Sequence, residues 1–186
     1  MQEARIGIFG GTFSPPHLGH LRAAEFFAAS RCLDRVLLFP AGASPLKEAK
    51  AGTSDEDRLA LCRLTFSTEL YEVCDWELRR PGPSYTIDTL RHVRERYPAA
   101  KLFLLIGEDQ RAQFHLWKDW RVILELAKLV VLPRHDKDAS GFAPLPISSS
   151  ELRIMIAQSQ DVSQYITPEA LNYILKNGLY DSTGLP

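Results

Sequence analysis

The sequence predicts an α/β fold, in which helices cover both faces of a doubly wound parallel sheet. Two observations carry this prediction: short apolar runs alternate with longer segments of helix-forming residues, and the runs are too continuous for strands that expose one face to water. Parallel strands joined by right-handed crossovers bind ligands beyond their carboxyl ends. The strand-like runs are Arg5–Gly10, Arg35–Pro40, Tyr71–Leu78, Lys101–Ile106 and Lys128–Leu132.

The segments between these runs predict the helices. Ser54, followed by Asp-Glu-Asp, provides an N-cap and first-turn acids for one of them. The stretch Arg134–Pro146 is polar and interrupted by glycine and proline, so we expect a loop there. We interpret residues 1–186 as one domain whose last helices, from about residue 148, close the site. The other expected helices are His17–Ser30, Ser84–Tyr97, Trp117–Ala127, Ser148–Ile156 and Pro168–Lys176.

Composition excludes several classes of protein. The 23 acidic and 22 basic residues nearly cancel, so no broad positive field would hold a nucleic acid, whereas a small phosphorylated ligand needs only a local cationic cleft. Cys32, Cys62 and Cys74 form no C-x-x-C pair, and we expect them to be reduced and mostly buried. The sequence shows neither a secretion signal nor an apolar run of membrane-spanning length, so we expect a cytoplasmic protein with no membrane partner. Homo-oligomerisation is left open.

The segment Gly10–His20, GGTFSPPHLGH, follows the first expected strand and is rich in glycine and polar residues. Adjacent Gly10 and Gly11 let a ligand approach the backbone and permit positive φ where the chain turns. The helix start beyond them would offer unpaired N–H groups to phosphate oxygens. His17 and His20 would point two ring donors at one place. The segment therefore predicts an anion site, although a plain turn and half of a metal site are the alternatives for its parts.

Three further segments could line the same edge of the sheet. Lys47 follows the second strand, where it could reach phosphate as a mobile charge instead of being a solvated surface lysine. The serines before Arg153 supply an N-cap and hydroxyl donors, so they could cap a helix only or form a clamp for the β- and γ-phosphates of ATP. Gly107 and Asp109 follow the fourth strand, where a ribose or adenine commonly binds. Trp117 could stack on a heteroaromatic base, although most aromatic residues on a helix belong to the core.

These motifs resemble a known family. The segment Gly10–His20, with its His-x-Gly-His ending, and Ile147-Ser-Ser-Ser together resemble the nucleotidyltransferase superfamily. The chain is similar, over nearly its whole length, to the bacterial nicotinate-nucleotide adenylyltransferases within it. That narrower likeness rests on Pro83-Ser84-Tyr85-Thr86, Gly107-x-Asp109, Phe114-x-x-Trp117-x-x-Trp120 and the tail motifs Tyr165-Ile166 and Leu171-x-Tyr173-Ile174.

The resemblance implies a Rossmann-like sheet of the nucleotidyltransferase type and a specific reaction. Nicotinate mononucleotide, ATP and Mg²⁺ would give nicotinate adenine dinucleotide and pyrophosphate, a step of NAD biosynthesis. Tyr85, Thr86 and Trp117 would match the nicotinate pocket, and Lys47 would bridge the reacting phosphates. The resemblance assigns ATP binding to Gly10, Gly11, Thr12, Phe13, Gly107, Asp109, Ser148 and Ser149, and phosphate chemistry to His17, His20, Lys47 and Arg153.

Two positions depart from the family pattern. Ser14 stands where the family most often has aspartate, so the resemblance does not imply how the phosphate loop is braced here. Leu46 stands where it most often has histidine, which removes one donor near the substrate phosphate.

The chemistry of the nucleophile sets the expected mechanism. A phosphate monoester is already largely ionised at neutral pH, so the enzyme needs no general base. In-line attack on the α-phosphorus requires the two anionic substrates to be held in place and their negative charge to be stabilised. Holding them together lowers the activation barrier by about 7–11 kcal/mol in a well-oriented case. We expect no covalent enzyme intermediate. No residue is expected to hold a metal by itself, because Mg²⁺ would arrive with the ATP phosphates and keep most of its waters.

Three alternatives share part of the pattern. A phosphopantetheine adenylyltransferase would explain Gly10–His20 but neither Tyr85-Thr86 nor Trp117-x-x-Trp120. A class I aminoacyl-tRNA synthetase would need a longer chain and a basic RNA-binding extension. A nucleotide-binding regulator that has lost turnover is supported only by Ser14 and Leu46.

Overall fold

A five-stranded parallel sheet forms the centre of the protein, in the order β3-β2-β1-β4-β5. The computed structural model describes residues 3–42, 53–132 and 142–181. Every pair of neighbouring strands is parallel, which confirms the predicted fold class. The strands are β1 (Arg5–Gly11), β2 (Arg35–Pro40), β3 (Tyr71–Val73), β4 (Lys101–Gly107) and β5 (Lys128–Leu132).

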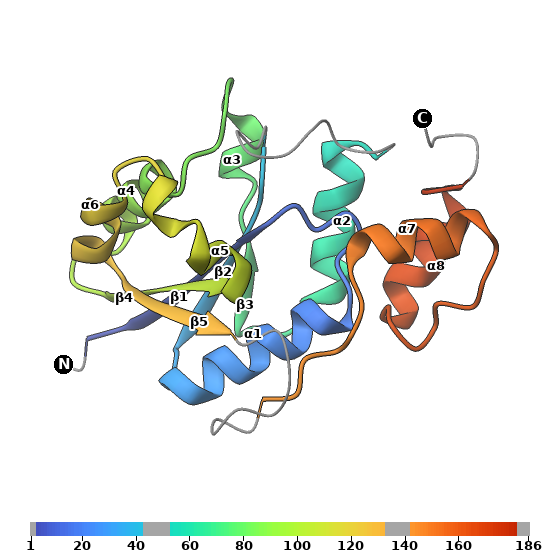
Figure 1. Ribbon diagram of the computed structural model, residues 1–186, viewed down its shortest axis with the longest axis horizontal. Coiled ribbons are helices and arrows are strands. Elements are labelled where there is room, and N and C mark those ends of the chain that lie inside the picture. Colours follow the sequence, from blue (N-terminus) through green and yellow to red (C-terminus); the bar gives the residue numbers. More distant parts are fainter. Residues whose placement is uncertain (1–2, 43–52, 133–141, 182–186) are drawn as a thin grey trace.

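Helices cover both faces of this sheet (Figure 1). On one face the buried side of α1 packs against alternate strand residues such as Leu38 and Phe103. On the other face α4 and α6 pack against the intervening residues, such as Ile8 and Leu104. The helices of the described chain are α1 (Leu18–Arg31), α2 (Asp55–Thr65), α3 (Trp76–Arg79), α4 (Thr86–Arg96), α5 (Glu108–Ala112), α6 (Trp120–Leu126), α7 (Ser149–Ala157) and α8 (Pro168–Lys176), with a 3₁₀ turn, η1, at Phe114–Leu116.

The last two helices, α7 and α8, form a third cluster with α2 beside the sheet (Figure 1). Leu61 of α2, Leu152 of α7 and Ile174 of α8 are buried together. Ser54 caps α2 as the sequence predicts, because its Oγ accepts a hydrogen bond from the N–H of Asp57 at 3.0 Å. This cluster places α2 and α7 on either side of the loop that follows β1.

Two expected elements differ from the structure by three or more residues at one end. The expected strand Tyr71–Leu78 is wrong beyond Val73: the carbonyl of Asp75 accepts from Leu78 and Arg79, and the chain forms α3. Glu77 of this turn is buried, and its carboxylate accepts a hydrogen bond from the Thr89 Oγ1 of α4. The expected helix Trp117–Ala127 begins only at Trp120, because Asp119 has a left-handed backbone (φ 53°), which Asp tolerates better than most residues.

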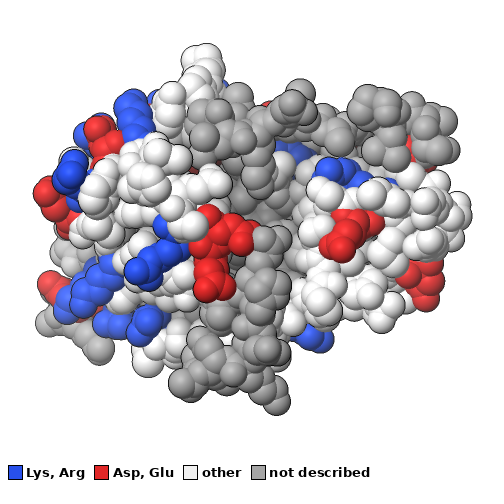
Figure 2. Space-filling view, in the orientation of Figure 1, with Lys and Arg blue, Asp and Glu red and all other residues white. Residues whose placement is uncertain are grey.

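The distribution of surface charge agrees with the composition, whereas the burial of the cysteines agrees with the expectation only in part. Basic and acidic side chains are mixed over the face shown in Figure 2, in agreement with the formal net charge of −1. The three cysteines are free, but the expectation that they are mostly buried is wrong for Cys32, which is exposed at the end of α1. Within the described ranges, no helix is long and apolar enough to cross a membrane.

Candidate active site

The Gly10–His20 segment and Gly107 lie at the edge of the sheet where the crossover connections leave in opposite directions. From β1 the chain proceeds to β2 and β3 on one side, whereas β4 leads to β5 on the other. Such a switch point between neighbouring strands is where open α/β sheets bind ligands. Gly10 and Gly11 end β1, and Gly107 ends the adjacent β4. The structure therefore brings the Gly10–His20 segment and the Gly107–Asp109 segment to one edge.

His17 and His20 lie against each other, with ring centroids 3.7 Å apart. His17 is the N-cap of α1: its Nδ1 accepts from the N–H of Gly19 at 3.1 Å, and the His20 Nδ1 accepts from the His17 N–H at 3.3 Å. Any Cβ at position 19 would lie 2.8 Å from the His17 Nδ1, so the close cap requires glycine there. Since both Nδ1 atoms accept, both rings carry their proton on Nε2 and present it as a donor.

The charge of His17 follows from its surroundings. The side chain is only 6% exposed. Burial lowers the pKa of His17 to about 4, against a smaller opposing effect of the Glu151 carboxylate. The ring is therefore neutral at physiological pH and can offer an anion a hydrogen-bond donor but no positive charge.

Two expectations about the backbone of this segment are wrong. The first N–H groups of α1 are not free for phosphate, because Leu18 donates to the Tyr165 carbonyl at 2.7 Å and Gly19 to the His17 ring. Among the described residues, positive φ occurs in this loop at Phe13 (φ 47°) and not at Gly10 or Gly11, which continue the strand. A left-handed backbone at a residue with a Cβ costs roughly 1–2 kcal/mol, so surrounding contacts must hold the loop in place.

Part of that support comes from α7. Arg153 donates from Nη1 to the Ser14 carbonyl at 2.7 Å, and the Ser149 Oγ donates to the Pro15 carbonyl at 2.9 Å. The Ser148 hydroxyl instead caps α7 by accepting from the Glu151 N–H at 3.2 Å. Of the expected ATP-binding residues, Ser149 and Arg153 therefore contact the loop directly, whereas Ser148 forms the helix cap.

The residues expected to bind nicotinate converge on one side of the same edge. Tyr85 is the N-cap of α4 and Thr86 its first residue. The Lys118 ammonium lies 4.5 Å from the Tyr85 ring centroid, which brings the Trp117–Lys118 segment next to Tyr85. Trp117 is partly buried, with its ring centroid 5.3 Å from that of Phe114. Tyr85 and Trp117 are both packed against the apolar cluster on this face of the sheet, and we call the pair the aromatic wall.

Asp109 and Lys47 complete the predicted set. Gly107 caps α5, and its N–H donates to the Gln110 Oε1 at 3.0 Å, which leaves Asp109 on the exposed first turn of that helix. Lys47 and Leu46 lie outside the described residues. No group of three or more His, Cys, Asp or Glu side chains suited to a metal ion occurs within the ranges that the structure describes.

The chain is similar to known proteins over most of its length. Residues 8–155 match the family model described as Cytidylyltransferase-like. The "Probable nicotinate-nucleotide adenylyltransferase" of Chlorobaculum parvum is 38% identical over 196 residues, with 96% of this chain and 100% of the relative covered. The protein of the same name from Roseiflexus sp. is 40% identical over 200 residues, with 97% and 100% covered. This chain belongs to the nicotinate-nucleotide adenylyltransferase family.

A solved structure supports the fold of this family member. The Plasmodium falciparum nicotinic acid mononucleotide adenylyltransferase complexed with NaAD has a TM-score of 0.74 to this chain, with 96% of this chain and 98% of that chain covered. At 19% sequence identity, the likeness concerns the fold alone.

Sequence reasoning missed two buried charged residues of this family member. Glu77 of α3 accepts a hydrogen bond from the Thr89 Oγ1 at 2.6 Å, and burial raises the pKa of its carboxyl group. Close by, the Gly42 N–H donates to the Ser84 Oγ at 3.2 Å, and a Cβ at Gly42 would lie 2.6 Å from the Glu77 carbonyl oxygen. The end of β2 is therefore joined to the segment that carries Tyr85.

Arg58 is the second missed residue. Its side chain on α2 is completely buried and makes hydrogen bonds to two loops of the site. The only signal in the sequence is an arginine among apolar residues, in the segment Asp57-Arg-Leu-Ala-Leu-Cys62, which would ordinarily indicate a solvated position on a helix.

Proposed function

We propose that this protein transfers the adenylyl group of ATP to nicotinate mononucleotide, which gives nicotinate adenine dinucleotide and pyrophosphate. The observation that carries the proposal is the close pair of His17 and His20 after the carboxyl end of β1, to which the aromatic wall of Tyr85 and Trp117 adds a second feature. The first feature fits the phosphates of a nucleotide, and the second fits a pyridine ring. Membership of the nicotinate-nucleotide adenylyltransferase family supports the same substrates.

The reaction needs no enzyme nucleophile. An oxygen of the substrate phosphate attacks the α-phosphorus of ATP, the bond from that phosphorus to the oxygen bridging to the β-phosphorus breaks, and pyrophosphate leaves with the electron pair. Negative charge spreads over the phosphoryl oxygens during this exchange. The Nε2–H groups of His17 and His20 would donate to those oxygens, and Lys47 and Arg153 would supply positive charge.

Arg153 can serve two purposes at once. A guanidinium has five N–H donors, which is more than its contacts to Ser14 and Ser150 use. The remaining donors would meet the β- and γ-phosphates while the bond to Ser14 holds the loop. The helices from Ser149 onward would in this way close the site over ATP.

The aromatic wall would select the nicotinate moiety. Trp117 would stack on the pyridine ring, and backbone N–H groups near Tyr85 and Thr86 would receive its carboxylate. Lys118, which lies over the Tyr85 ring, adds a positive charge on that side.

Mg²⁺ fits as a partner of the ATP phosphates. Both site histidines use Nδ1 as an acceptor and carry a proton on Nε2, so their rings are donors and not metal ligands. Mg²⁺ commonly keeps several waters and binds through substrate phosphates, where it neutralises charge. The protein would then contact the phosphate oxygens that the metal leaves open.

ATP and mononucleotide substrates are intracellular metabolites, which is why we place the reaction in the cytoplasm.

The test is pyrophosphate release with ATP and Mg²⁺, measured in parallel with nicotinate mononucleotide, its amide form and phosphopantetheine. We expect turnover chiefly on the nicotinate nucleotide, with a loss of at least about 100-fold in His20→Ala. Turnover chiefly on another acceptor would overturn the proposed substrate. ATP binding without release on any acceptor would favour a regulator over an enzyme.

A further inference from the structure

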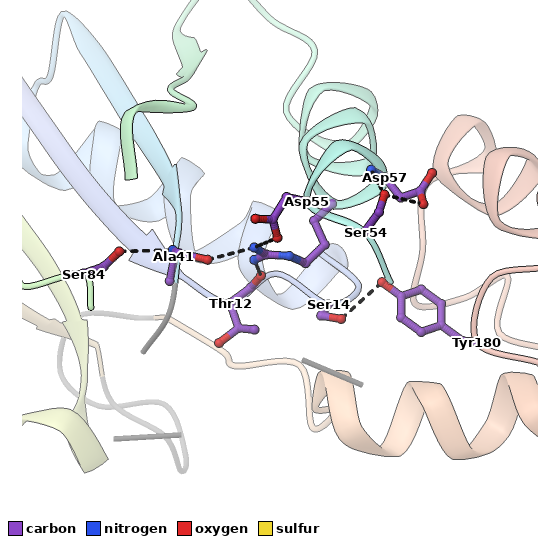
Figure 3. Close-up of polar contacts among 10 residues, drawn as sticks. Thr12, Ser14, Ala41, Ser54, Asp55, Asp57, Ser84 and Tyr180 are labelled. Carbon is purple, nitrogen blue, oxygen red and sulfur yellow. Dashed lines mark hydrogen bonds and ion pairs between the residues drawn. The ribbon is translucent and has the colours of Figure 1, made fainter. Parts of the chain in front are cut away.

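The guanidinium of Arg58 connects three segments around the phosphate site. It is 0% exposed, and its Nη1 donates to the Thr12 carbonyl at 2.7 Å. Its Nη2 donates to the Ala41 carbonyl and to the Asp55 Oδ1, each at 2.8 Å. Figure 3 shows Thr12, Ala41 and Asp55 converging on this group. One side chain therefore joins the loop after β1, the end of β2 and the start of α2.

The bond to Thr12 determines where the next N–H group points. In a planar trans peptide, the carbonyl and the following N–H point in opposite directions. Because Arg58 holds the Thr12 carbonyl on the side of α2, the Phe13 N–H faces the opposite side of the loop. Within the described part of the chain, we find no hydrogen-bond partner for this N–H.

The loop would not keep this arrangement without help. Phe13 has a left-handed backbone (φ 47°), which is unfavourable for a residue with a Cβ. Its ring is buried, and on its C-terminal side the Ser14 carbonyl is held by Arg153 of α7. Arg58 and Arg153 thus hold the carbonyls of Thr12 and Ser14, one on each side of Phe13, from two different helices.

We propose that Arg58 is a positioning residue that turns the Phe13 N–H toward a phosphate oxygen of ATP. The inference rests on the proposed function. The early N–H groups of α1 are taken by other partners, so a donor is needed from the loop itself. The same guanidinium holds the carbonyl of Ala41, the residue that directly follows β2.

Only arginine has the geometry for this task. Its planar group offers donors in several fixed directions, so that Nη1 and Nη2 reach carbonyls of two different segments. A lysine at this position would keep the charge but could not reproduce the fork. Arg58→Lys therefore separates the geometry of the group from its charge.

The experiment compares ATP with adenosine, which lacks the phosphates, as ligands of Arg58→Lys. We expect the Kd of ATP to rise about tenfold, the loss of one hydrogen bond to a charged group, and the Kd of adenosine to stay unchanged. We expect kcat/KM for ATP to fall about 100-fold, because the reacting groups lose their alignment. An equal loss of both affinities, or unchanged ATP binding, would overturn the proposal.

Arg94 offers a matched control. Its guanidinium likewise makes three hydrogen bonds, all to backbone carbonyls: those of Pro98 at 3.1 Å, Ala100 at 2.7 Å and Leu126 at 3.1 Å. These carbonyls lie at the opposite edge of the sheet, where β4 and β5 begin. Arg94→Lys should leave both affinities and kcat unchanged even if it lowers the Tm. A change in ATP affinity in this control equal to that in Arg58→Lys would contradict the proposal.

A second measurement uses the unaltered protein and so does not depend on any variant folding. In protein labelled with ¹⁵N at phenylalanine, the Phe13 N–H signal should move on addition of ATP and stay in place with adenosine. No movement with ATP would overturn the proposal. Since these binding measurements need no turnover, they also separate a failure of this inference from a failure of the proposed reaction.

Discussion

The hydroxyl oxygens of Ser14 and Tyr180 lie 3.3 Å apart inside the protein, although 166 positions separate them in the chain (Figure 3). Ser14 is 2% exposed and Tyr180 4%. Burial raises the pKa of Tyr180, so its hydroxyl stays protonated and can act as the donor. The segment after α8 therefore contacts the loop that follows β1 at Ser14.

Tyr180→Phe should destabilise the protein, because it leaves the buried Ser14 hydroxyl without this partner. We expect a loss of about 1 kcal/mol in the free energy of unfolding, seen as a decrease of roughly 2–4 °C in Tm. Tyr173→Phe is the control: its hydroxyl bonds Asp57 at 2.9 Å near the surface, and its removal should change the Tm little. Equal Tm values for the two variants would contradict the assignment.

Acid should destabilise the protein in part through His17. Because its folded pKa of about 4 lies below the reference value of 6.5, the unfolded chain binds a proton between these pH values that the folded protein does not. The contribution is fully present above the higher value and is lost as the pH falls to the lower one, with an upper size of about 3 kcal/mol.

His17→Asn tests this dependence. Asparagine keeps an oxygen that can cap α1 but cannot take up a proton in this range. Urea unfolding at about pH 7 and about pH 4.5 should show a smaller loss of stability in the variant than in the parent. Parallel losses in the two proteins would mean that His17 does not titrate in this way.

The two serines that the sequence assigns to ATP should behave differently. Ser148→Ala should lower the free energy of unfolding by about 1 kcal/mol through loss of the α7 cap, with little change in KM for ATP. Ser149→Ala should raise that KM roughly fivefold, because the bond to the Pro15 carbonyl holds the phosphate loop. Measuring Tm and KM for both variants decides the matter, and the reverse pattern would refute it.

Trp117→Ala should weaken binding of nicotinate mononucleotide and not of ATP. Stacking on a base contributes about 1–3 kcal/mol, so we expect KM for the mononucleotide to rise roughly tenfold or more. Trp76 is the control, since its ring is already stacked on His92 with centroids 4.5 Å apart. If Trp76→Ala raised the same KM equally, the stacking role of Trp117 would be untenable.

Local patterns made the sheet, most helices and the approximate place of the site predictable. Strand and helix signals come from residues that are close together in the sequence. The same holds for the cap of α2 by Ser54 and for the cap of α1 by His17, which needs the glycine at position 19. The helix start at Trp120 was missed because one left-handed residue, Asp119, outweighed a run of helix formers. The strand beyond Val73 was wrong because Glu77 finds a buried partner in Thr89.

The sequence by itself thus determined the order of strands and helices along the chain, because periodicity and turn chemistry act over a few residues. From that order it also placed the Gly10–His20 and Gly107–Asp109 segments at one edge of a parallel sheet. Only the tertiary structure decided that Arg58 is buried, that Arg153 and Tyr180 contact Ser14, and that His17 is neutral. Those properties depend on partners and on burial supplied by distant segments, and no local pattern of residues encodes them.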